Sequence, residues 1–461
     1  MKKNLSIKPK ENDVSNLLYN FKEVFSTYLD SDAFNEASRC LSCINSPCKN
    51  GCPLNNDIVK INELIKHKKY EEAYEVLIET NPFPSICGRV CQQELQCEKA
   101  CTLNKVKNSE AVAIGKLERF LGDKFLDKQF LKTNLKLNKK VAIIGSGPAG
   151  LACAEKLITN GIDVTIFEKE KYFGGLLIYG IPEFCLPRIY VDSVINKLKL
   201  LGVNFINNTT IETKEDLNNL FFSGFGAIFI AHGANVPRKM NIVGEDFKGV
   251  ISATEYLKIT NFKENFKKPA YEYIFDAKKV VIVGGGNVAI DCDRMALRLG
   301  ASHVYNLYRR SESEMPARKE EFLNAKKENV DFRFLTNPIE IISENNDKVS
   351  SIKCLKMELG ELDASGRRKP IPIKGSEFNI DCDLVVMALG SISNSYKMAL
   401  ENGIKINKYG YFMVEEDTME TNVKNIYAGG DCVTGPTTVA LAIKAGLKVA
   451  NAIINKYKQN L

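Results

Sequence analysis

The chain of 461 residues has no segment typical of an export signal or a membrane anchor. Its first residues, MKKNLSIKPKENDVSN, contain no apolar core region and no small-residue cleavage site. No apolar run reaches the roughly 18 residues that would predict a membrane span. We therefore expect a cytoplasmic protein without membrane contact. In that compartment thiols stay reduced, and clustered cysteines usually bind metal or take part in catalysis.

The charge pattern gives no sign of a nucleic-acid partner. The net charge is +7, and the lysines are scattered along the chain. There is no compact basic stripe with interleaved aromatic residues, which argues against nucleic-acid binding. The composition, 44% hydrophobic and 26% charged, is that of a globular protein, and 461 residues predict two or three domains.

Cysteine is unevenly distributed, with eight of the 14 cysteines in the first 101 residues. They form two groups with short, unequal spacings: Cys40-x2-Cys43-x4-Cys48-x3-Cys52-Pro53 and Cys87-x3-Cys91-x5-Cys97-x3-Cys101. Thiolates suit iron and sulfide, and a Cys-Pro ending is typical of chains that wrap iron–sulfur cubes. Zinc is the alternative, but the second group has no Cys-x2-Cys knuckle and neither group contains histidine. We therefore predict two 4Fe-4S clusters.

The local pattern changes after the cysteine-rich part. Apolar residues recur at helical spacing over 58–80, and Asn81-Pro82-Phe83-Pro84 is expected to end that helix. From Val141 onward, short apolar strands alternate with glycine turns and helices, which is typical of parallel α/β sheets. Two copies of one such unit begin near residues 141 and 281. Two dinucleotide-binding units in one chain predict two bound dinucleotides.

The first unit carries the fingerprint Gly145-x-Gly147-x-x-Gly150 between a strand and a helix. The first glycine makes a tight turn, the second lets the backbone approach a pyrophosphate, and the third lets helix and strand pack closely. The helix N-terminus then faces the phosphates. Glu168 ends the next strand at about the expected distance of 20 residues, where a carboxylate can bind ribose hydroxyls.

A second segment near the C-terminus is expected to complete this site. Residues 426–432 read Ile-Tyr-Ala-Gly-Gly-Asp-Cys and precede the helical sequence TVALAIKAGLKVA. This turn resembles the distal flavin motif of flavoproteins with two dinucleotide domains. In that motif the aspartate, here Asp431, holds the ribityl chain of FAD. We therefore predict FAD as the first dinucleotide.

The second unit carries Gly284-x-Gly286-x-x-Ala289, in which alanine is an accepted variant. The acid expected at the end of the next strand is missing, and the chain instead reads Leu307-Tyr308-Arg309-Arg310. Two guanidinium groups can bind the extra phosphate of NADP through charge-assisted bonds, so NADPH is favoured over NADH. This unit has no Cys-x-x-Cys dithiol. The N-terminal clusters are therefore the expected outlet for flavin electrons.

Together these residues resemble a known family over essentially the whole chain. The chain is similar to the small (β) subunit of NADPH-dependent glutamate synthase, to the large subunit of NADH-dependent ferredoxin:NADP oxidoreductase, and to the N-terminal half of dihydropyrimidine dehydrogenase. The motifs that carry the resemblance are EASRCLSC (36–43), CGRVCQQELQCEKAC (87–101), AIGKLERF (113–120), GGLLIYGIPEF (174–184), YRRSESEMPAR (308–318) and the C-terminal AGGD turn.

The resemblance implies a crossed set of cluster ligands. The first cluster would take Cys40, Cys43, Cys48 and Glu118, and the second would take Cys52, Cys91, Cys97 and Cys101. This agrees with the ferredoxin rule that the cysteine before proline ligates the other cluster. Cys87 would then be a bystander, although simple counting assigns it to the second group. One departure is Cys185, because relatives have a basic residue near the flavin at that position.

The expected cofactor residues complete the site prediction. For FAD they are Gly145, Gly147, Ala149, Gly150, Glu168, Gly175, Gly430 and Asp431; for NADPH they are Gly284, Gly286, Asn287, Ala289, Arg309 and Arg310. No catalytic side chain is named, because hydride transfer to a flavin needs stacking and alignment without a protein acid or base.

The expected fold is α/β, with a helical iron–sulfur domain and two Rossmann-like domains, the NADPH domain being inserted into the FAD domain. The expected boundaries are 1–135 for the iron–sulfur domain, 136–265 and 391–461 for the FAD domain, and 266–390 for the NADPH domain. The resemblance implies electron transfer from NADPH through FAD and two clusters to a glutamate synthase large subunit or another flavin-containing partner. The alternative is the large subunit of an electron-bifurcating NADH-dependent ferredoxin:NADP oxidoreductase. The chain lacks the length for an FMN barrel, and Lys2 follows the initiator methionine where an amidotransferase has cysteine.

Overall fold

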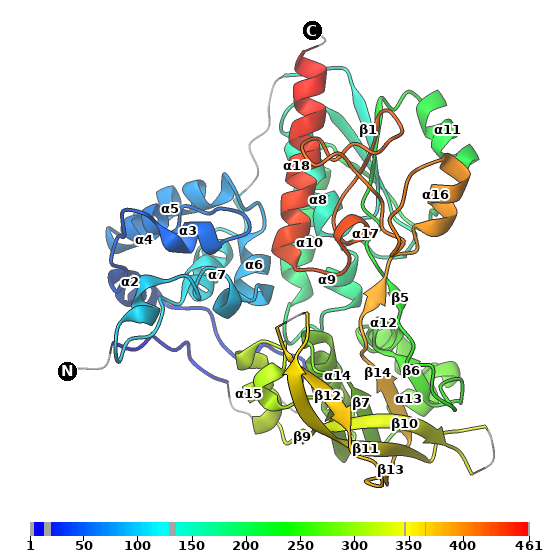
Figure 1. Cartoon of the computed structure of the whole chain (residues 1–461). Coiled ribbons are helices and arrows are strands. Elements are labelled where there is room, and N and C mark those ends of the chain that lie inside the picture. Colours follow the sequence, from blue (N-terminus) through cyan, green and yellow to red (C-terminus); the bar gives the residue numbers. More distant parts are fainter. Residues whose placement is uncertain (1–3, 13–19, 129–134, 345–346, 365, 460–461) are drawn as a thin grey trace.

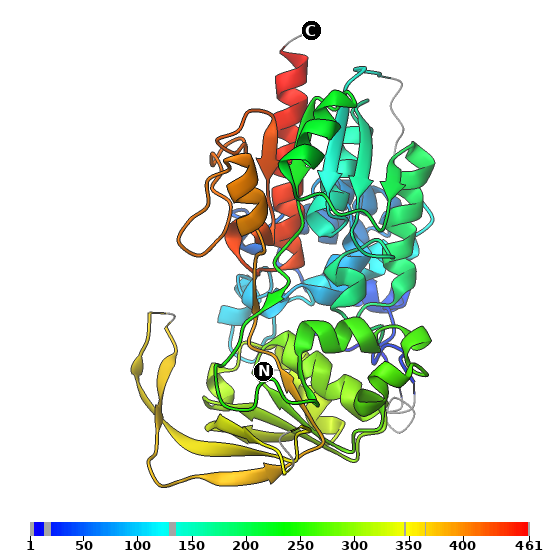
Figure 2. The same ribbon diagram turned by 90° about the vertical axis from the view of Figure 1, so that its right-hand side faces the viewer.

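The computed structural model describes residues 4–12, 20–128, 135–344, 347–364 and 366–459 (Figure 1). It has a helical N-terminal region and two units that are each built on a parallel sheet, so the predicted α/β fold class is confirmed. Figures 1 and 2 show the two sheet units one above the other, and Figure 1 shows the helical region beside them. Within the described residues, no helix is long and apolar enough to cross a membrane.

The N-terminal region consists of short helices that bury one face. Its elements are α2 (Asp30–Ser38), α3 (Pro47–Gly51), α4 (Ile58–Lys66), α5 (Tyr70–Ile78), α6 (Pro84–Val90), η1 (Gln93–Leu95), η2 (Thr102–Lys105) and α7 (Ile114–Lys124). The single helix expected over 58–80 is two helices, α4 and α5. Lys68 has a left-handed φ of 58° between them, which no continuing helix allows. Pro84 occupies the first turn of α6, where its missing N–H costs nothing.

The first sheet has five parallel strands in the order β16-β4-β1-β2-β3. The strands are β1 (Lys140–Ile144), β2 (Asp163–Phe167), β3 (Asn204–Ile206), β4 (Ala227–Ile230) and β16 (Ile426–Ala428). The helices of this unit are α8 (Pro148–Ile158), α9 (Leu176–Tyr179), α10 (Arg188–Leu201), α11 (Lys214–Phe222), α16 (Tyr396–Asn402), α17 (Asp431–Thr434) and α18 (Val439–Lys458). Because β16 comes from the C-terminal part of the chain, the second unit is an insertion in the first.

The second sheet has five parallel strands in the order β6-β14-β7-β8-β9. The strands are β6 (Val250–Ser252), β7 (Lys279–Val283), β8 (His303–Tyr308), β9 (Asp331–Phe334) and β14 (Leu384–Met387). The helices are α12 (Ala253–Thr260), η3 (Lys263–Asn265), η4 (Pro269–Tyr271), α13 (Glu272–Phe275), α14 (Asn287–Arg298), η5 (Glu312–Glu314) and α15 (Lys319–Lys327). The sheet includes β6, whose three residues lie before the boundary expected at residue 265 and are too short a run to be recognised in the sequence.

An antiparallel sheet and a short ribbon complete the second unit and its connection. The antiparallel strands are β10 (Thr336–Ile342), β11 (Ser351–Leu362), β12 (Arg368–Pro372) and β13 (Phe378–Asp381). The ribbon pairs β5 (Val236–Pro237) with β15 (Ser391–Ile392) in antiparallel fashion. The chain leaves the first unit through β5 and returns through β15, so this ribbon joins the two units.

The buried cores show how the three regions pack. Val141 and Ile143 of β1 belong to the core of the first unit. The same core includes Phe83, Ile86 and Cys87 around α6. The helix α6, which carries Cys87, is therefore packed directly on the first sheet unit.

Candidate functional site

A cavity of about 770 Å³ lies where the first sheet ends, and residues of both units line it. It receives the loops that follow β1, β2, β4 and β16, as expected at the carboxyl edge of a parallel sheet. The FAD residues expected from the sequence that line it are Gly145, Gly147, Ala149, Glu168, Gly175, Gly430 and Asp431. Gly150 lies behind the lining, on α8.

The three glycines of the first fingerprint have different structural roles. Gly145 has a φ of 104°, and a Cβ added there would lie 2.6 Å from the carbonyl oxygen of Ala231. A Cβ at Gly150 would lie 2.1 Å from the carbonyl oxygen of Gly145, so this position keeps α8 close to β1. A Cβ at Gly147 would meet no atom within 4 Å. The backbone at Gly147 is therefore open to a ligand, as the pyrophosphate of a dinucleotide requires.

Glu168 connects the end of β2 to the fingerprint loop. Its Oε2 accepts hydrogen bonds from the backbone N–H of Ser146 at 3.0 Å and from the Ser146 hydroxyl at 2.6 Å. Its Oε1 accepts from the N–H of Glu170 at 3.0 Å. Because a carboxylate has about four acceptor sites, Glu168 retains capacity for ribose hydroxyls.

The C-terminal segment lies against the first fingerprint helix. Gly430 has a φ of 76°, and a Cβ added there would lie 3.2 Å from the Cβ of Ala149. The Oδ1 of Asp431 accepts from the backbone N–H and the hydroxyl of Thr437, both at 3.1 Å. Burial raises the pKa of Asp431. These contacts fix the carboxylate beside the N-terminus of α18.

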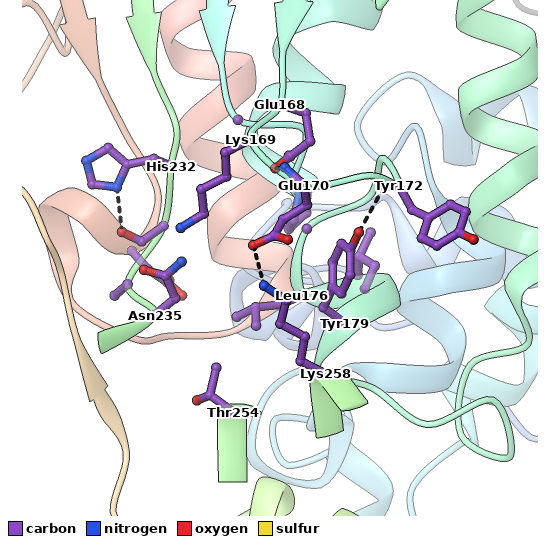
Figure 3. A pocket seen from close by; sticks show the side chains of 18 of the residues that line it. Glu168, Lys169, Glu170, Tyr172, Leu176, Tyr179, His232, Asn235, Thr254 and Lys258 are labelled. Carbon is purple, nitrogen blue, oxygen red and sulfur yellow. Dashed lines mark hydrogen bonds and ion pairs between the residues drawn. The ribbon is translucent and has the colours of Figure 1, made fainter. Parts of the chain in front are cut away.

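The opposite wall of the cavity comes from α12. The ammonium of Lys258 donates to the carboxylate of Glu170 at 2.7 Å, and Figure 3 shows the two side chains pointing toward each other.

His232, which follows β4, also lines the cavity, with its Nδ1 3.0 Å from the carbonyl oxygen of Gly233 (Figure 3). Burial lowers the pKa of His232 to about 4, so the ring is neutral at pH 7. Its buried Nε2 has no hydrogen-bond partner among the described residues.

The second fingerprint has the same backbone form but does not line this cavity. Gly284 has a φ of 148°, and a Cβ there would lie 2.4 Å from the carbonyl oxygen of Ala388. A Cβ at Gly286 would meet no atom within 4 Å, as at Gly147. Ala289 is buried in α14. The Oδ1 of Asn287 accepts the backbone N–H of Arg318 at 2.7 Å.

The two arginines after β8 lie in different environments. Arg309 is exposed. Arg310 is 5% exposed; its Nη2 donates to Asp363 at 2.7 Å and its Nε donates to the carbonyl oxygen of Arg368 at 2.8 Å. Arg310 therefore anchors the hairpin of β11 and β12 through Nε and Nη2.

The outer cysteine group contains Cys40, Cys43, Cys48 and Cys101. Burial and then the neighbouring Cys40 thiol raise the pKa of Cys48 to about 11, and Cys101 adds to the shift. The Sγ of Cys43 lies 3.2 Å from the hydroxyl of Thr102, the residue after Cys101. Three of these cysteines are partly exposed, so this group lies near the surface.

The inner cysteine group contains Cys52, Cys87, Cys91 and Cys97. Burial and then Glu118 raise the pKa of Cys52 to about 11, and Cys91 adds to the shift. A hydrogen bond with Cys91, burial, and the nearby Glu118 and Cys52 raise the pKa of Cys87 well above its usual range. Cys87 is therefore a spatial neighbour of Cys91, which keeps both thiols as candidate ligands.

Glu118 of α7 is held beside the inner group. Its Oε1 accepts from the side-chain amides of Asn81 and, at 3.4 Å, Asn56. Burial raises the pKa of Glu118 to about 8, although the two amide bonds act in the opposite direction.

This arrangement differs from the expected grouping by one exchange. Cys101 lies with the outer group and Glu118 with the inner group, whereas the resemblance had implied the reverse. The reason is long-range: η2 brings Cys101 back to Cys48, and α7 brings Glu118 to Cys52. Over the described ranges, no three His, Cys, Asp or Glu side chains converge tightly enough for a single metal ion. A cubane cluster suits a wider set, because each ligand binds a different iron atom.

Cys185 lies in the second unit's surroundings and does not line the cavity. Its Sγ donates to Asp291 at 3.3 Å and to Glu321 at 3.6 Å. The departure from relatives at Cys185 therefore lies at the contact between the two units and outside the lining of the cavity.

Sequence reasoning missed several residues of this site. Ser146 fills the variable position of Gly-x-Gly and carries the bonds to Glu168. Thr438 caps α18, its hydroxyl accepting the N–H of Leu441 at 3.3 Å. A threonine just before an apolar helical run is an N-cap signal that could have identified it. Nothing in the sequence pattern marks Lys258, which reaches the cavity only through the packing of α12.

The fold and the cavity define a pyridine-nucleotide- and flavin-dependent oxidoreductase joined to a cysteine-rich domain. Residues 18–130 match the family described as dihydropyrimidine dehydrogenase domain II, 4Fe-4S cluster. Residues 139–446 match pyridine nucleotide-disulphide oxidoreductase. The fold resembles that of Mycobacterium tuberculosis FprA in complex with NADPH, with a TM-score of 0.56, 20% identity, and coverage of 70% of this chain and 85% of FprA.

Relatives that match most of this chain identify the family within this class of oxidoreductase. The glutamate synthase [NADPH] small chain of Escherichia coli is 35% identical over 94% of this chain and 93% of its own length. The putative oxidoreductase AegA of the same organism is 37% identical over 94% of this chain and 67% of its length. The NADP(+)-dependent formate dehydrogenase subunit beta of Moorella thermoacetica is 35% identical over 90% of this chain and 60% of its length. The chain belongs to the glutamate synthase small-chain family, with a 4Fe-4S domain and a pyridine nucleotide-disulphide oxidoreductase domain.

Proposed function

We propose that the protein is an NADPH-dependent oxidoreductase of the glutamate synthase small-subunit type. It passes electrons from NADPH through FAD and two 4Fe-4S clusters to a partner that makes glutamate from glutamine and 2-oxoglutarate. The observation that carries this proposal is the shared core of α6 and the first unit. It sets the inner cysteine group against the unit that has the dinucleotide cavity.

The residues around the cavity fit FAD. The open backbone at Gly147 and the N-terminus of α8 suit the pyrophosphate, Glu168 suits the adenosine ribose, and Asp431 suits the ribityl chain. When bound, FAD would accept a hydride, two electrons with one proton, from NADPH and release the electrons one at a time to the clusters. The chain's own part is to bind, align and shield the reactants.

For the second dinucleotide we propose Arg309 as the main reader of the NADP phosphate. It is exposed at the end of β8, where a dinucleotide's ribose is expected. Arg310 is already engaged by Asp363, so its contribution is to hold the hairpin next to this position.

For the clusters we propose one ligand set from each group. The outer cluster takes Cys40, Cys43, Cys48 and Cys101, and the inner cluster takes Cys52, Cys91, Cys97 and Glu118. Cys87 remains the competitor of Cys91 or Glu118 in the inner set. Electrons would leave from the outer cluster, where Leu41 is 53% exposed and Ile44 fully exposed beside Cys43.

The experiment is anaerobic purification followed by cofactor and activity analysis. We expect about eight iron and about eight sulfide per chain, which two cubane clusters contain, together with one FAD. NADPH should reduce artificial electron acceptors, and the isolated chain should form no glutamate from glutamine and 2-oxoglutarate. Stoichiometric zinc without iron, or glutamine-dependent glutamate formation by this chain alone, would refute the proposal.

The ligand sets can be separated by low-temperature electron spin resonance. Cys101→Ala should alter the same signal as Cys48→Ala, whereas Glu118→Ala should alter the signal that Cys52→Ala alters. If Cys87→Ala removes a cluster and Glu118→Ala changes neither signal, the inner cluster is held by four cysteines.

The partner is identified by co-purification from the native organism. Relatives of similar identity have other roles in their names, such as the NADPH-Fe(3+) oxidoreductase subunit beta of Geobacter sulfurreducens. A flavin-containing subunit that handles NADH and ferredoxin would favour the electron-bifurcating alternative over glutamate synthesis.

A further inference from the structure

The N-terminal end of α15 contacts both the second fingerprint and the cysteine-bearing region. The backbone N–H of Arg318 donates to Asn287 of the fingerprint helix at 2.7 Å. Its guanidinium turns the other way: Nη1 donates to the carbonyl oxygen of Arg89, and Nη2 donates to Oε1 of Gln93 at 3.3 Å. Arg318 is only 9% exposed, so these bonds form a buried connection between the two regions.

The acceptors of Arg318 belong to the cysteine segment itself. Arg89 lies between Cys87 and Cys91 on α6. The side chain of Gln93 donates to the carbonyl oxygens of Cys87 at 3.2 Å and Gly88 at 3.4 Å. Since α6 also belongs to the core of the first unit, this helix contacts both dinucleotide units.

The two residues that follow Arg318 make a second connection. The ammonium of Lys116 on α7 donates to both carboxylate oxygens of Glu320, at 2.8 and 3.0 Å. The backbone N–H of Lys319 donates to Glu94 at 3.0 Å. Residues 318–320 thus contact α6, η1 and α7 together.

We propose that Arg318 is a positioning residue for hydride transfer, which fixes the second dinucleotide unit against α6 and so against the flavin cavity. This inference rests on the proposed function. The chain crosses between the two units through the two-residue strands β5 and β15, and the units also touch directly, as where Lys258 donates to Glu170. Arg318 adds a separate connection that runs through α6. Reactants must be held in near-attack geometry, and a misplacement of about 1 Å can cost about 100-fold in rate.

The expected signature separates positioning from nucleotide affinity. Arg318→Ala removes the guanidinium and leaves the carbonyl oxygen of Arg89 and the amide of Gln93 without these bonds. The backbone bond to Asn287 remains possible in the variant. We therefore expect the rate constant of flavin reduction at saturating NADPH to fall by about 100-fold, while the Kd for NADP+ changes by less than about threefold.

The test uses the FAD- and cluster-containing protein under anaerobic conditions. Stopped-flow absorbance measures flavin reduction, calorimetry measures the Kd for NADP+, and hydrogen exchange reports the amides of residues 84–93. Arg318→Lys keeps the charge but cannot reproduce the fork of donors, so we expect partial recovery of the rate. The matched control is Glu11→Gln. Glu11 forms an exposed ion pair, at 2.7 Å, with Lys327 at the other end of α15. It should leave all three measurements unchanged.

The outcomes are distinct. An Arg318→Ala protein that reduces its flavin at the wild-type rate, or whose loss is explained wholly by a weaker Kd, overturns the proposal. If that variant does not retain FAD, Lys116→Met replaces it. A slower flavin reduction with an unchanged Kd then supports the proposal, and an unchanged rate overturns it. Failure of the wild-type protein to oxidise NADPH would instead refute the proposed function.

Discussion

The two dinucleotide units share the same strand–turn–helix fingerprint, but their fingerprint helices α8 and α14 pack in different ways. In the first unit, α8 has small residues and approaches α18 so closely that a Cβ at Gly446 would lie 2.1 Å from the carbonyl oxygen of Ala149. In the second unit, the positions matching Ala152 and Ala154 are Asp291 and Asp293. The fingerprint helix of the first unit therefore packs through small residues, whereas that of the second unit carries charged residues at the matching positions.

The charged groups of α14 form a buried network. Arg294 donates to Glu328 at 2.9 Å and to Glu321, and Arg298 donates to Glu328 at 2.7 Å. The guanidinium of Arg298 lies 4.1 Å from the ring centre of Phe184, which belongs to the loop before α10 of the first unit. Buried ion pairs add little net stability but require one specific geometry. The helix α8 therefore packs against α18 of its own unit, whereas α14 also contacts the first unit through Arg298 and Phe184.

The largest expected difference concerns the third fingerprint position. Gly150→Ala places a methyl group 2.1 Å from a backbone oxygen, and we expect loss of bound flavin with a cost of about 3 kcal/mol. The converse change in the second unit, Ala289→Gly, should cost only about 1 kcal/mol through helix propensity. Flavin absorbance and denaturant unfolding measure both effects. A Gly150→Ala protein that keeps its flavin would contradict the close packing of α8 on β1.

Substitution of the second fingerprint glycine, Gly147 or Gly286, should separate FAD binding from NADP+ binding while the fold is preserved. Gly147 and Gly286 have no atom within 4 Å of an added Cβ, so valine should be tolerated at both positions in the folded chain. Gly147→Val should reduce FAD binding by about 100-fold or more, because the side chain fills the space of a pyrophosphate. Gly286→Val should retain FAD but lose NADP+ binding by a similar factor. Calorimetry with each nucleotide checks the pair, and loss of FAD from both variants would mean that the two sites are not independent.

Much of each unit could be predicted because its signals are local. Gly145 and Glu168 lie within one strand–turn–helix–strand unit, and Gly284 lies in the matching turn of the second unit. The sequence spacing alone indicates the place of all three. The position of Arg310 depends on Asp363, which lies 53 residues away on a hairpin with no recognisable pattern. Likewise, Glu118 joins the inner cysteine group only when α7 folds back onto it.

Nucleotide preference should separate the two neighbouring arginines. Arg309→Ala should lower kcat/KM for NADPH by about 10- to 100-fold and for NADH by less than about twofold, since one charge-assisted bond is worth about 1.5–3 kcal/mol. Arg310→Ala should instead lower the free energy of unfolding, because it removes the buried guanidinium that pairs with Asp363. Steady-state kinetics with both nucleotides and denaturant unfolding separate the two effects. Equal losses for NADPH and NADH in Arg309→Ala would mean that Arg309 does not read the phosphate.

The smallest expected effect is a change in how the stability of the protein depends on pH, and it concerns Asp291 in the charged network of α14. Burial and the neighbouring carboxylate of Glu321 raise the pKa of Asp291 to about 7, while Cys185, Arg294 and Arg318 act in the opposite direction. The folded protein therefore binds this proton more tightly than the unfolded chain, whose aspartate has a pKa near 3.9. The stability from this group is present at low pH and is lost as the pH rises through about 7.

Asn cannot ionise, so Asp291→Asn should reduce the fall in melting temperature between about pH 5.5 and pH 8, and should be the more stable protein at pH 8. The matched control is Asp331→Asn, since Asp331 is 42% exposed and pairs with Arg333 on the surface. Thermal unfolding followed by circular dichroism at both pH values gives the comparison. The first unit has Ala152 at the matching position, so no carboxyl titrates at that position of α8. If Asp291→Asn and wild type lose the same stability over this range, the carboxylate is ionised throughout and the network, rather than a proton, neutralises it.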